Sequence, residues 1–138
     1  MKVQAYVSFS GRCEEALEFY KTSIGAEVTG LLRWKESPDA GMQPPPGYEE
    51  KVMHASFRIG ETELMADDGL VQTQAEFKGM TLAIEVADDA EAARVFAALG
   101  AGGKVTMPLM KTFWTSSFGM LTDRFGVPWM VNVAAPKA

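Results

Sequence analysis

The chain of 138 residues is 47% apolar and 22% charged, which is typical of one soluble globular domain and leaves too little length for two independent domains of ordinary size. Its formal net charge of −5, without a cluster of Lys and Arg, argues against a nucleic-acid-binding surface, because binding to phosphates depends on such clusters. A single cysteine excludes an intrachain disulfide. Since the sequence shows neither a signal peptide nor an apolar run of membrane-spanning length, we expect a cytoplasmic location and no membrane partner.

The first half of the chain begins with a strand and a helix. Apolar and polar residues alternate over residues 3–9, which predicts a strand with one buried face. A helix follows, and Gly25 is placed to end it, because glycine tolerates the left-handed backbone of a helix C-terminus. A second strand is expected over residues 27–34. The helix is predicted from apolar residues at helical spacing, which are Cys13, Ala16, Leu17, Tyr20 and Ile24.

Residues 37–51 interrupt all periodicity with four of the chain's seven prolines. Proline cannot donate to a strand ladder, so we expect a surface loop there, either a simple connector or a lid over a site. Residues 52–59 and 62–67 then predict a hairpin across Gly60 and Glu61, a pair that suits a type II′ turn.

The second half of the chain repeats this order. Residues 80–86 predict a strand, and residues 88–99 predict a helix with a capping box made by Asp88 and Glu91, which Gly100 ends. Three further strands are expected over 104–107, 114–121 and 128–133, with a turn at 123–126 before the last.

An internal echo supports two related modules. The segment IGAEV at 24–28 resembles LGAGGKV at 99–105, and both follow a predicted helix. We therefore predict an α+β fold in which two βαβββ modules, about 1–68 and 79–136, form a single domain and bury a shared face.

Three segments in the same order carry a family resemblance: GRCEEALEFYKTSIGAEV, HASFRIGETELMADD and FWTSSFGMLTDRFGVPWMVNV. They resemble the PhnB-like branch of the vicinal oxygen chelate superfamily, which includes glyoxalase I, fosfomycin-resistance and bleomycin-resistance proteins and extradiol dioxygenases. The resemblance implies mixed sheets curled into a cup with helices outside, usually in a homodimer. Members of this branch are often described as demethylubiquinone methyltransferases, but the sequence has no Gly-rich loop after a strand of the kind that a Rossmann-like nucleotide site uses.

The resemblance also implies a divalent metal in the cup, held by His, Glu or Gln. Here the matching positions are Gln4 or Tyr6 in the first strand, Met65 in the first module, and Thr81 and Met130 in the second. Thioethers are soft ligands that suit Mg, Mn or catalytic Zn poorly, so we expect no metal and no other cofactor. The alternative is a displaced Mg, Mn or Zn site.

The only histidine, His54, is the main candidate for acid–base chemistry. If Ile59 pairs with Thr62 across the turn, His54 lies opposite Asp67 on one face, an arrangement that suits a general base. Glu85 is a second acid–base candidate. The alternative is a structural histidine that a cross-strand partner satisfies.

Residues of the last strands are candidates for ligand contact. If Trp129, Val131 and Val133 face the helix, Met130 and Asn132 face the cup beside the strand at 80–86. Trp114 resembles an aromatic near the site in this branch and could stack on a planar ligand. Plain core packing is the alternative for both Trp114 and Met130.

Two functions are consistent with these residues. The first is a protein that binds a small organic molecule without the usual metal. The second is a lyase-, isomerase- or dioxygenase-like enzyme that uses a displaced metal or a His54 and Asp67 acid–base pair.

Overall fold

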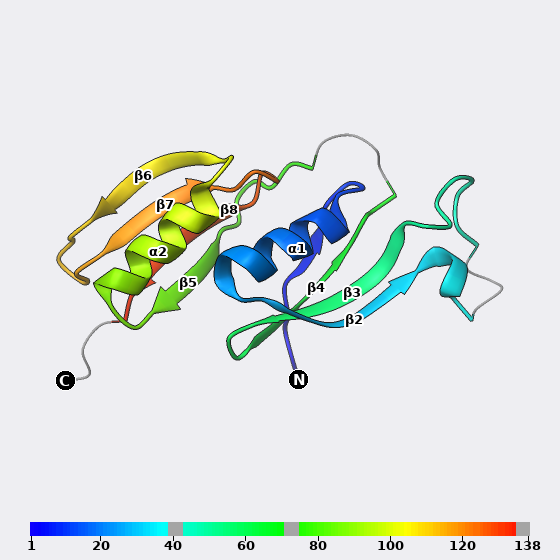
Figure 1. The fold of residues 1–138 in the computed structure, drawn as a ribbon, viewed down its shortest axis with the longest axis horizontal. Helices are drawn as coiled ribbons and strands as arrows, with labels where there is room; N and C mark the ends of the chain where they lie inside the picture. The colour runs from blue at the N-terminus through cyan, green and yellow to red at the C-terminus, as the bar shows by residue number, and fades with distance from the viewer. Residues whose placement is uncertain (39–42, 71–74, 135–138) are drawn as a thin grey trace. The chain divides into compact units, whose positions relative to one another are not determined.

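The structure, a computed structural model, describes residues 1–38, 43–70 and 75–134. The chain forms two compact units, Met1–Ala75 and Glu76–Ala138. In each unit one α-helix packs on one face of an open, four-stranded mixed sheet (Figure 1). The predicted α+β class and the βαβββ order of each module are therefore confirmed.

Unit 1 has the strand order β1-β4-β3-β2, with β1 parallel to β4 and the other pairs antiparallel. The first strand is shorter than predicted, and Trp34 belongs to a 3-10 turn rather than to the second strand. The hairpin of β3 and β4 has the predicted bounds, and Gly60 at its turn has φ +58°. The elements are β1 (Tyr6–Ser8), α1 (Cys13–Ile24), β2 (Glu27–Arg33), η1 (Trp34–Glu36), β3 (Val52–Ile59) and β4 (Thr62–Asp67).

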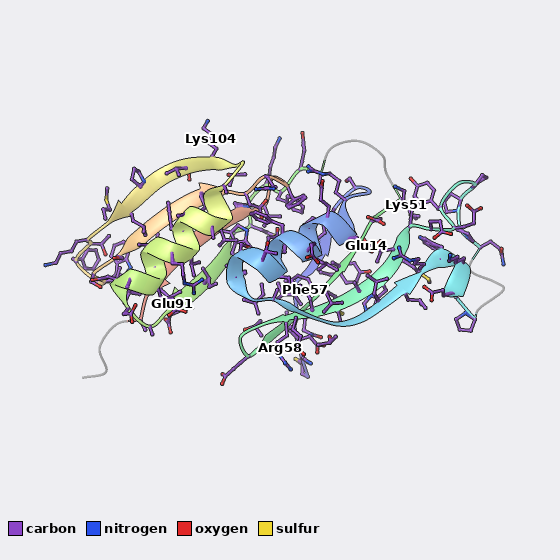
Figure 2. The ribbon with its side chains drawn as sticks, in the orientation of Figure 1. Glu14, Lys51, Phe57, Arg58, Glu91 and Lys104 are labelled. Atoms are coloured by element: carbon purple, nitrogen blue, oxygen red, sulfur yellow. The ribbon has the colours of Figure 1, made fainter. Side chains whose placement is uncertain are left out.

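The core of unit 1 lies between α1 and the sheet. Tyr20 of α1 stacks on Phe57 of β3 with ring centroids 6.3 Å apart, and Figure 2 shows Phe57 beneath the helix. Gly25 has φ +70° and caps the helix through an N–H bond to the Lys21 carbonyl, as its position predicts. The helix buries the apolar stripe expected from its sequence, with Ile24 half-buried at its end.

A carboxylate from outside the helix caps the start of α1. Arg12, the residue before the helix, makes no capping bond with its side chain. Instead Asp68, which is only 5% exposed, accepts hydrogen bonds from the Cys13 N–H at 2.8 Å and the Val52 N–H at 2.6 Å. Asp68 therefore ties the helix to the start of β3, and its negative charge complements the positive end of the helix dipole.

Unit 2 has the equivalent strand order β5-β8-β7-β6, with β5 parallel to β8. The strand predicted over 114–121 begins only at Phe118, so Trp114 lies in the loop before it, and β6 continues three residues beyond its predicted end. Gly100 is the last residue of the helix rather than the residue after it. The elements are β5 (Leu82–Val86), α2 (Asp89–Gly100), β6 (Lys104–Met110), β7 (Phe118–Thr122) and β8 (Pro128–Val133).

The predicted capping box of α2 is half correct. The Asp88 carboxylate accepts a hydrogen bond from the Glu91 N–H at 2.8 Å. The Glu91 carboxylate, however, accepts from the N–H of Ala87 at 3.1 Å, one residue before the expected partner. Both carboxylates still satisfy N–H groups at the start of the helix.

Strand β8 has the predicted orientation. Trp129, Val131 and Val133 are buried, whereas the intervening Met130 and Asn132 are half-buried. The buried face is the helix side, because Val131 pairs with Gly119 of β7, where a Cβ would stand 2.6 Å from the Phe96 ring of α2. Met130 therefore lies on the sheet face opposite α2.

Three predicted segments extend outside the described residues: 39–42 of the proline-rich loop, 71–74 of the loop between the modules, and 135–136 at the end of the second module. Within the described part of the chain, no helix is long and apolar enough to cross a membrane.

We predict that Asp68→Asn lowers the free energy of unfolding by about 2–4 kcal/mol, because an amide keeps one acceptor and turns a donor toward a backbone N–H. Urea unfolding followed by far-UV circular dichroism measures the loss. Glu61→Gln, in the exposed hairpin turn, removes the same charge and is the matched control. Equal stability of the two variants would contradict the capping by Asp68.

Candidate functional site

The face of the unit 1 sheet opposite α1 carries three of the predicted polar residues, Tyr6, His54 and Asp67. Val7 and Ala66 are buried toward the helix, so their neighbours on β1 and β4 project from the other face. Ile59 pairs with Thr62 as predicted, and the ladder continues to Ala55 and Ala66. The ladder ends there, so His54 and Asp67 are the next residues on β3 and β4, on the same sheet face but not in a regular pair.

Asp67 is the anchor of this polar group. Its Oδ1 atom accepts hydrogen bonds from the Ser8 hydroxyl at 2.6 Å and the Gly69 N–H at 3.0 Å, and its Oδ2 atom accepts one from the Tyr6 hydroxyl at 3.0 Å. Three donors, two from β1 and one from the segment after β4, therefore fix one carboxylate. Hydrogen bonds to a charged acceptor are stronger than neutral ones, so this arrangement holds Tyr6 in place.

The hydroxyl of Tyr6 links Asp67 to His54. It lies 3.4 Å from His54 Nδ1, and Ser56 Oγ lies 3.5 Å from His54 Nε2. Burial, and then the hydrogen bond to Asp67, raise the pKa of Tyr6 to about 12, so the phenol keeps its proton. The sequence predicted a direct pair of His54 and Asp67, whereas the structure places Tyr6 between them. We name these three residues the Tyr6 cluster.

A pocket of about 360 Å³ opens beside the Tyr6 cluster. Trp34 supplies a large aromatic surface, and Leu70 is held by a hydrogen bond from the Tyr48 hydroxyl to its carbonyl at 3.3 Å. The pocket thus combines one polar wall with an otherwise largely apolar lining, made by Tyr6, Trp34, Val52, Met53, His54, Asp67, Gly69 and Leu70.

Two other predicted residues of unit 1 lie outside this lining. The Gln4 amide donates to the Glu63 carbonyl at 3.2 Å and to its carboxylate at 3.3 Å, which directs Gln4 away from the Tyr6 cluster. Met65 pairs with Tyr6 on one side and with Ser56 on the other, and is half-buried. It shares the sheet face of the cluster.

The remaining predicted residues belong to unit 2. The indole N–H of Trp114 donates to Asn132 Oδ1 at 3.1 Å, and its ring meets Phe118 edge-on at 5.2 Å. Met130 pairs with Ala83 of β5 and Met120 of β7. Two residues complete the set: Glu85 is exposed beside Asn132, and Thr81 precedes β5. Glu85 is therefore not in the unit that carries His54 and Asp67.

The superfamily metal can be tested against the residues that stand at its positions. Gln4 offers one amide oxygen on a side chain that bonds to Glu63, Tyr6 is engaged with Asp67, and the thioethers Met65 and Met130 have no hard oxygen to offer. Thr81 would add only a hydroxyl. This donor set does not fit a Mg, Mn or catalytic Zn ion. Among the described residues there is also no group of three or more His, Cys, Asp or Glu that could hold one.

Several residues of the site were not predicted. Ser8 and Ser56 each lie two residues from a predicted member, Tyr6 and His54, so strand alternation alone could have placed them on the same face. Trp34 and Leu70 could not be found in this way, because irregular segments at the strand ends bring them to the pocket.

Relatives of this chain cover nearly its whole length. Residues 1–132 match the family model of 3-demethylubiquinone-9 3-methyltransferase. Protein YjdN of Escherichia coli K12 is 35% identical over 140 residues, which span 96% of this chain and 95% of YjdN.

Two solved structures are also similar to this chain over nearly its whole length. Protein PA1353 of Pseudomonas aeruginosa is 40% identical, with a TM-score of 0.84 over 96% of this chain and 97% of that one. A protein from Bacillus cereus, described as a putative 3-demethylubiquinone-9 3-methyltransferase and PhnB protein, is 30% identical, with a TM-score of 0.81 over 97% of this chain and 100% of that one.

More distant structures share the fold alone. A glyoxalase-related enzyme from Fulvimarina pelagi is 17% identical with a TM-score of 0.62, and covers 97% of this chain and 88% of its own. The fosfomycin-resistance protein FosX of Mesorhizobium loti is 13% identical with a TM-score of 0.61, over 96% and 90%. The chain therefore belongs to the PhnB-like 3-demethylubiquinone-9 3-methyltransferase family, and it shares its fold with the glyoxalase-related and fosfomycin-resistance proteins.

Proposed function

We propose that this protein binds a small organic molecule in the unit 1 pocket. The observation that supports this most is the convergence of Tyr6, His54 and Asp67 on one wall of a pocket whose other side chains are mainly apolar. Ligand sites typically join a mostly apolar lining to a few fixed polar groups. At about 360 Å³ the pocket is at the small end of the range for such sites.

The polar wall and the apolar lining would contact different parts of the ligand. The Tyr6 cluster is suited to a hydrogen-bonding group, since its members are already oriented by bonds to one another. The apolar side chains are suited to an apolar or planar part of the ligand. An aromatic ring such as Trp34 can stack on a flat group, and a flexible thioether such as Met53 adapts its shape to what it contacts, beside the aliphatic Leu70.

The methyltransferase in the family's name has little support in this fold. A nucleotide site of the Rossmann kind uses a Gly-rich strand-to-helix turn with free N–H groups at the helix start. Here Asp68 accepts the N–H of Cys13 at the start of α1, and Asp88 accepts the N–H of Glu91 at the start of α2. Carboxylates thus occupy these turns, which favours a role other than nucleotide-dependent methyl transfer.

Residues of unit 2 form a second set of proposed ligand contacts. The bond from Trp114 to Asn132 orients an indole ring that is 45% exposed, and Met130 lies on the same sheet face as Asn132. A planar ligand group could stack on the indole. We also propose a homodimer, a single domain built from both modules, and a cytoplasmic location.

A second candidate function is proton transfer by His54. It is favoured by the link from His54 through the Tyr6 hydroxyl to Asp67, because a carboxylate that orients an imidazole is typical of a general base. The hydrogen bond of 3.4 Å is long, and such bonds tighten in many enzymes when the substrate binds.

We predict that Trp34→Ala weakens the binding of small aromatic alcohols, amides and amines by about tenfold, because the largest apolar surface of the pocket is lost. Hits are found and ranked by ligand-observed NMR. Val105→Ala in unit 2, whose side chain is 49% exposed and which pairs with the buried Leu121, removes apolar surface away from both proposed contact sites and should leave these affinities unchanged. Hits that do not respond to Trp34→Ala would show that the pocket is not the binding site.

His54→Gln separates binding from catalysis. If the pocket only binds, the variant keeps the affinity of a bound fragment within about threefold, since glutamine retains a polar group of similar reach. If His54 transfers a proton, turnover of any substrate found falls by about a hundredfold or more while the fold and the affinity persist. Full turnover in the variant would exclude the second candidate.

A further inference from the structure

We propose that the unit 1 pocket selects ligands whose polar group is a hydrogen-bond donor, cationic or neutral, and rejects carboxylates and phosphates. This inference rests on the proposed binding function and names the chemical class of the ligand. It follows from which atoms of the Tyr6 cluster donate hydrogen bonds and which accept them, and from which charged side chains line the pocket.

The donor and acceptor roles in the Tyr6 cluster follow one from another, starting at Asp67. A carboxylate only accepts, so the single hydrogen of the Tyr6 hydroxyl points to Asp67 at 3.0 Å. The Tyr6 oxygen is then an acceptor toward His54 Nδ1, 3.4 Å away, which places the proton of neutral His54 on Nδ1. His54 Nε2 is left as an acceptor.

The groups that remain for a ligand are therefore acceptors. Asp67 Oδ2 accepts one bond, from Tyr6, and has a second lone pair. Within residues 1–38, 43–70 and 75–134, the hydrogen-bond partner of His54 Nε2 is the Ser56 hydroxyl, at the long distance of 3.5 Å. Trp34 adds a side-chain donor to the pocket lining, its uncharged indole N–H.

The charge of the lining agrees with this inference. Asp67 supplies a carboxylate, and no Lys or Arg is among the described residues that line the pocket. The basic residues that flank Trp34 in sequence are paired elsewhere: Arg33 with Glu14 at 2.6 Å, and Lys35 with Glu50 at 2.7 Å. An anionic ligand would thus meet a like charge without a counter-ion, whereas a cationic donor would gain a charge-assisted bond and the face of Trp34.

The test uses three planar probes of nearly equal size: benzamidinium, benzamide and benzoate. Because His54 is the only histidine, its ring signals in the NMR spectrum are assigned without further work and report on binding beside it. At pH about 8.5, where imidazoles are neutral, benzamidinium should bind about tenfold or more tightly than benzoate, with benzamide between them.

Two variants connect the preference to Asp67. Asp67→Asn keeps the shape and removes the charge, so the preference for benzamidinium over benzoate should shrink by about fivefold or more. Glu63→Gln is the matched control: it removes the same charge from an exposed residue of the same strand outside the pocket lining, and should leave the preference unchanged.

The outcomes distinguish this inference from the function on which it rests. Benzoate binding as tightly as benzamidinium, with both shifting the His54 signals, would overturn the ligand class and leave the binding function standing. A preference that persists in Asp67→Asn would also overturn it, because the net charge of the protein would then be the cause. No shift with any probe up to about 10 mM would overturn the binding function itself.

Discussion

The buried carboxylate of Asp68 is the constraint on which unit 1 depends. Its side chain accepts from the start of α1 and the start of β3, while its own backbone accepts from Gly11 at 2.8 Å and donates to Val52 at 3.0 Å. One residue thus joins three segments of the chain. Asp67 and Asp68 are neighbours on opposite sides of the sheet, so the bonds that fix Asp68 on the helix side also fix where Asp67 stands on the open face.

The two units are versions of one module that differ on their open faces. Ser56 and Met65 pair in unit 1 as Met120 and Met130 do in unit 2. Two residues further along each strand, His54 and Asp67 correspond in position to Phe118 and Asn132. The same sheet positions therefore carry an imidazole and a carboxylate in unit 1, and an aromatic ring and an amide in unit 2. The difference is consistent with distinct contributions of the two faces to binding.

Local pattern predicted most of the fold. The helix at Cys13–Ile24 and the hairpin around Gly60 have the expected bounds, because their periodicity and their glycines act within a few residues. Trp114 was wrongly placed in a strand, since a turn that depends on the Thr115 hydroxyl bonding to the Val133 carbonyl at 2.7 Å has no local signal.

The site was predictable only in part, for a related reason. Counting residues from the hairpin turn predicted the pairs from Ile59 and Thr62 to Ala55 and Ala66, and so put His54 and Asp67 on one sheet face. The position of Tyr6 between them depends on the parallel pairing of β1 with β4, a contact between residues about 60 apart in sequence that no local pattern encodes. The same holds for Asp68, whose partners Cys13 and Val52 are distant along the chain.

The most direct test of this account is the tautomer of neutral His54, measured from the two ring nitrogens in a ¹⁵N NMR spectrum. Since the chain has one histidine, the spectrum needs no assignment. We expect the proton on Nδ1 in the natural sequence, and loss of that preference in Tyr6→Phe, which removes the accepting oxygen. A proton on Nε2 in both proteins would show that Tyr6 does not connect His54 to Asp67, and would contradict the account.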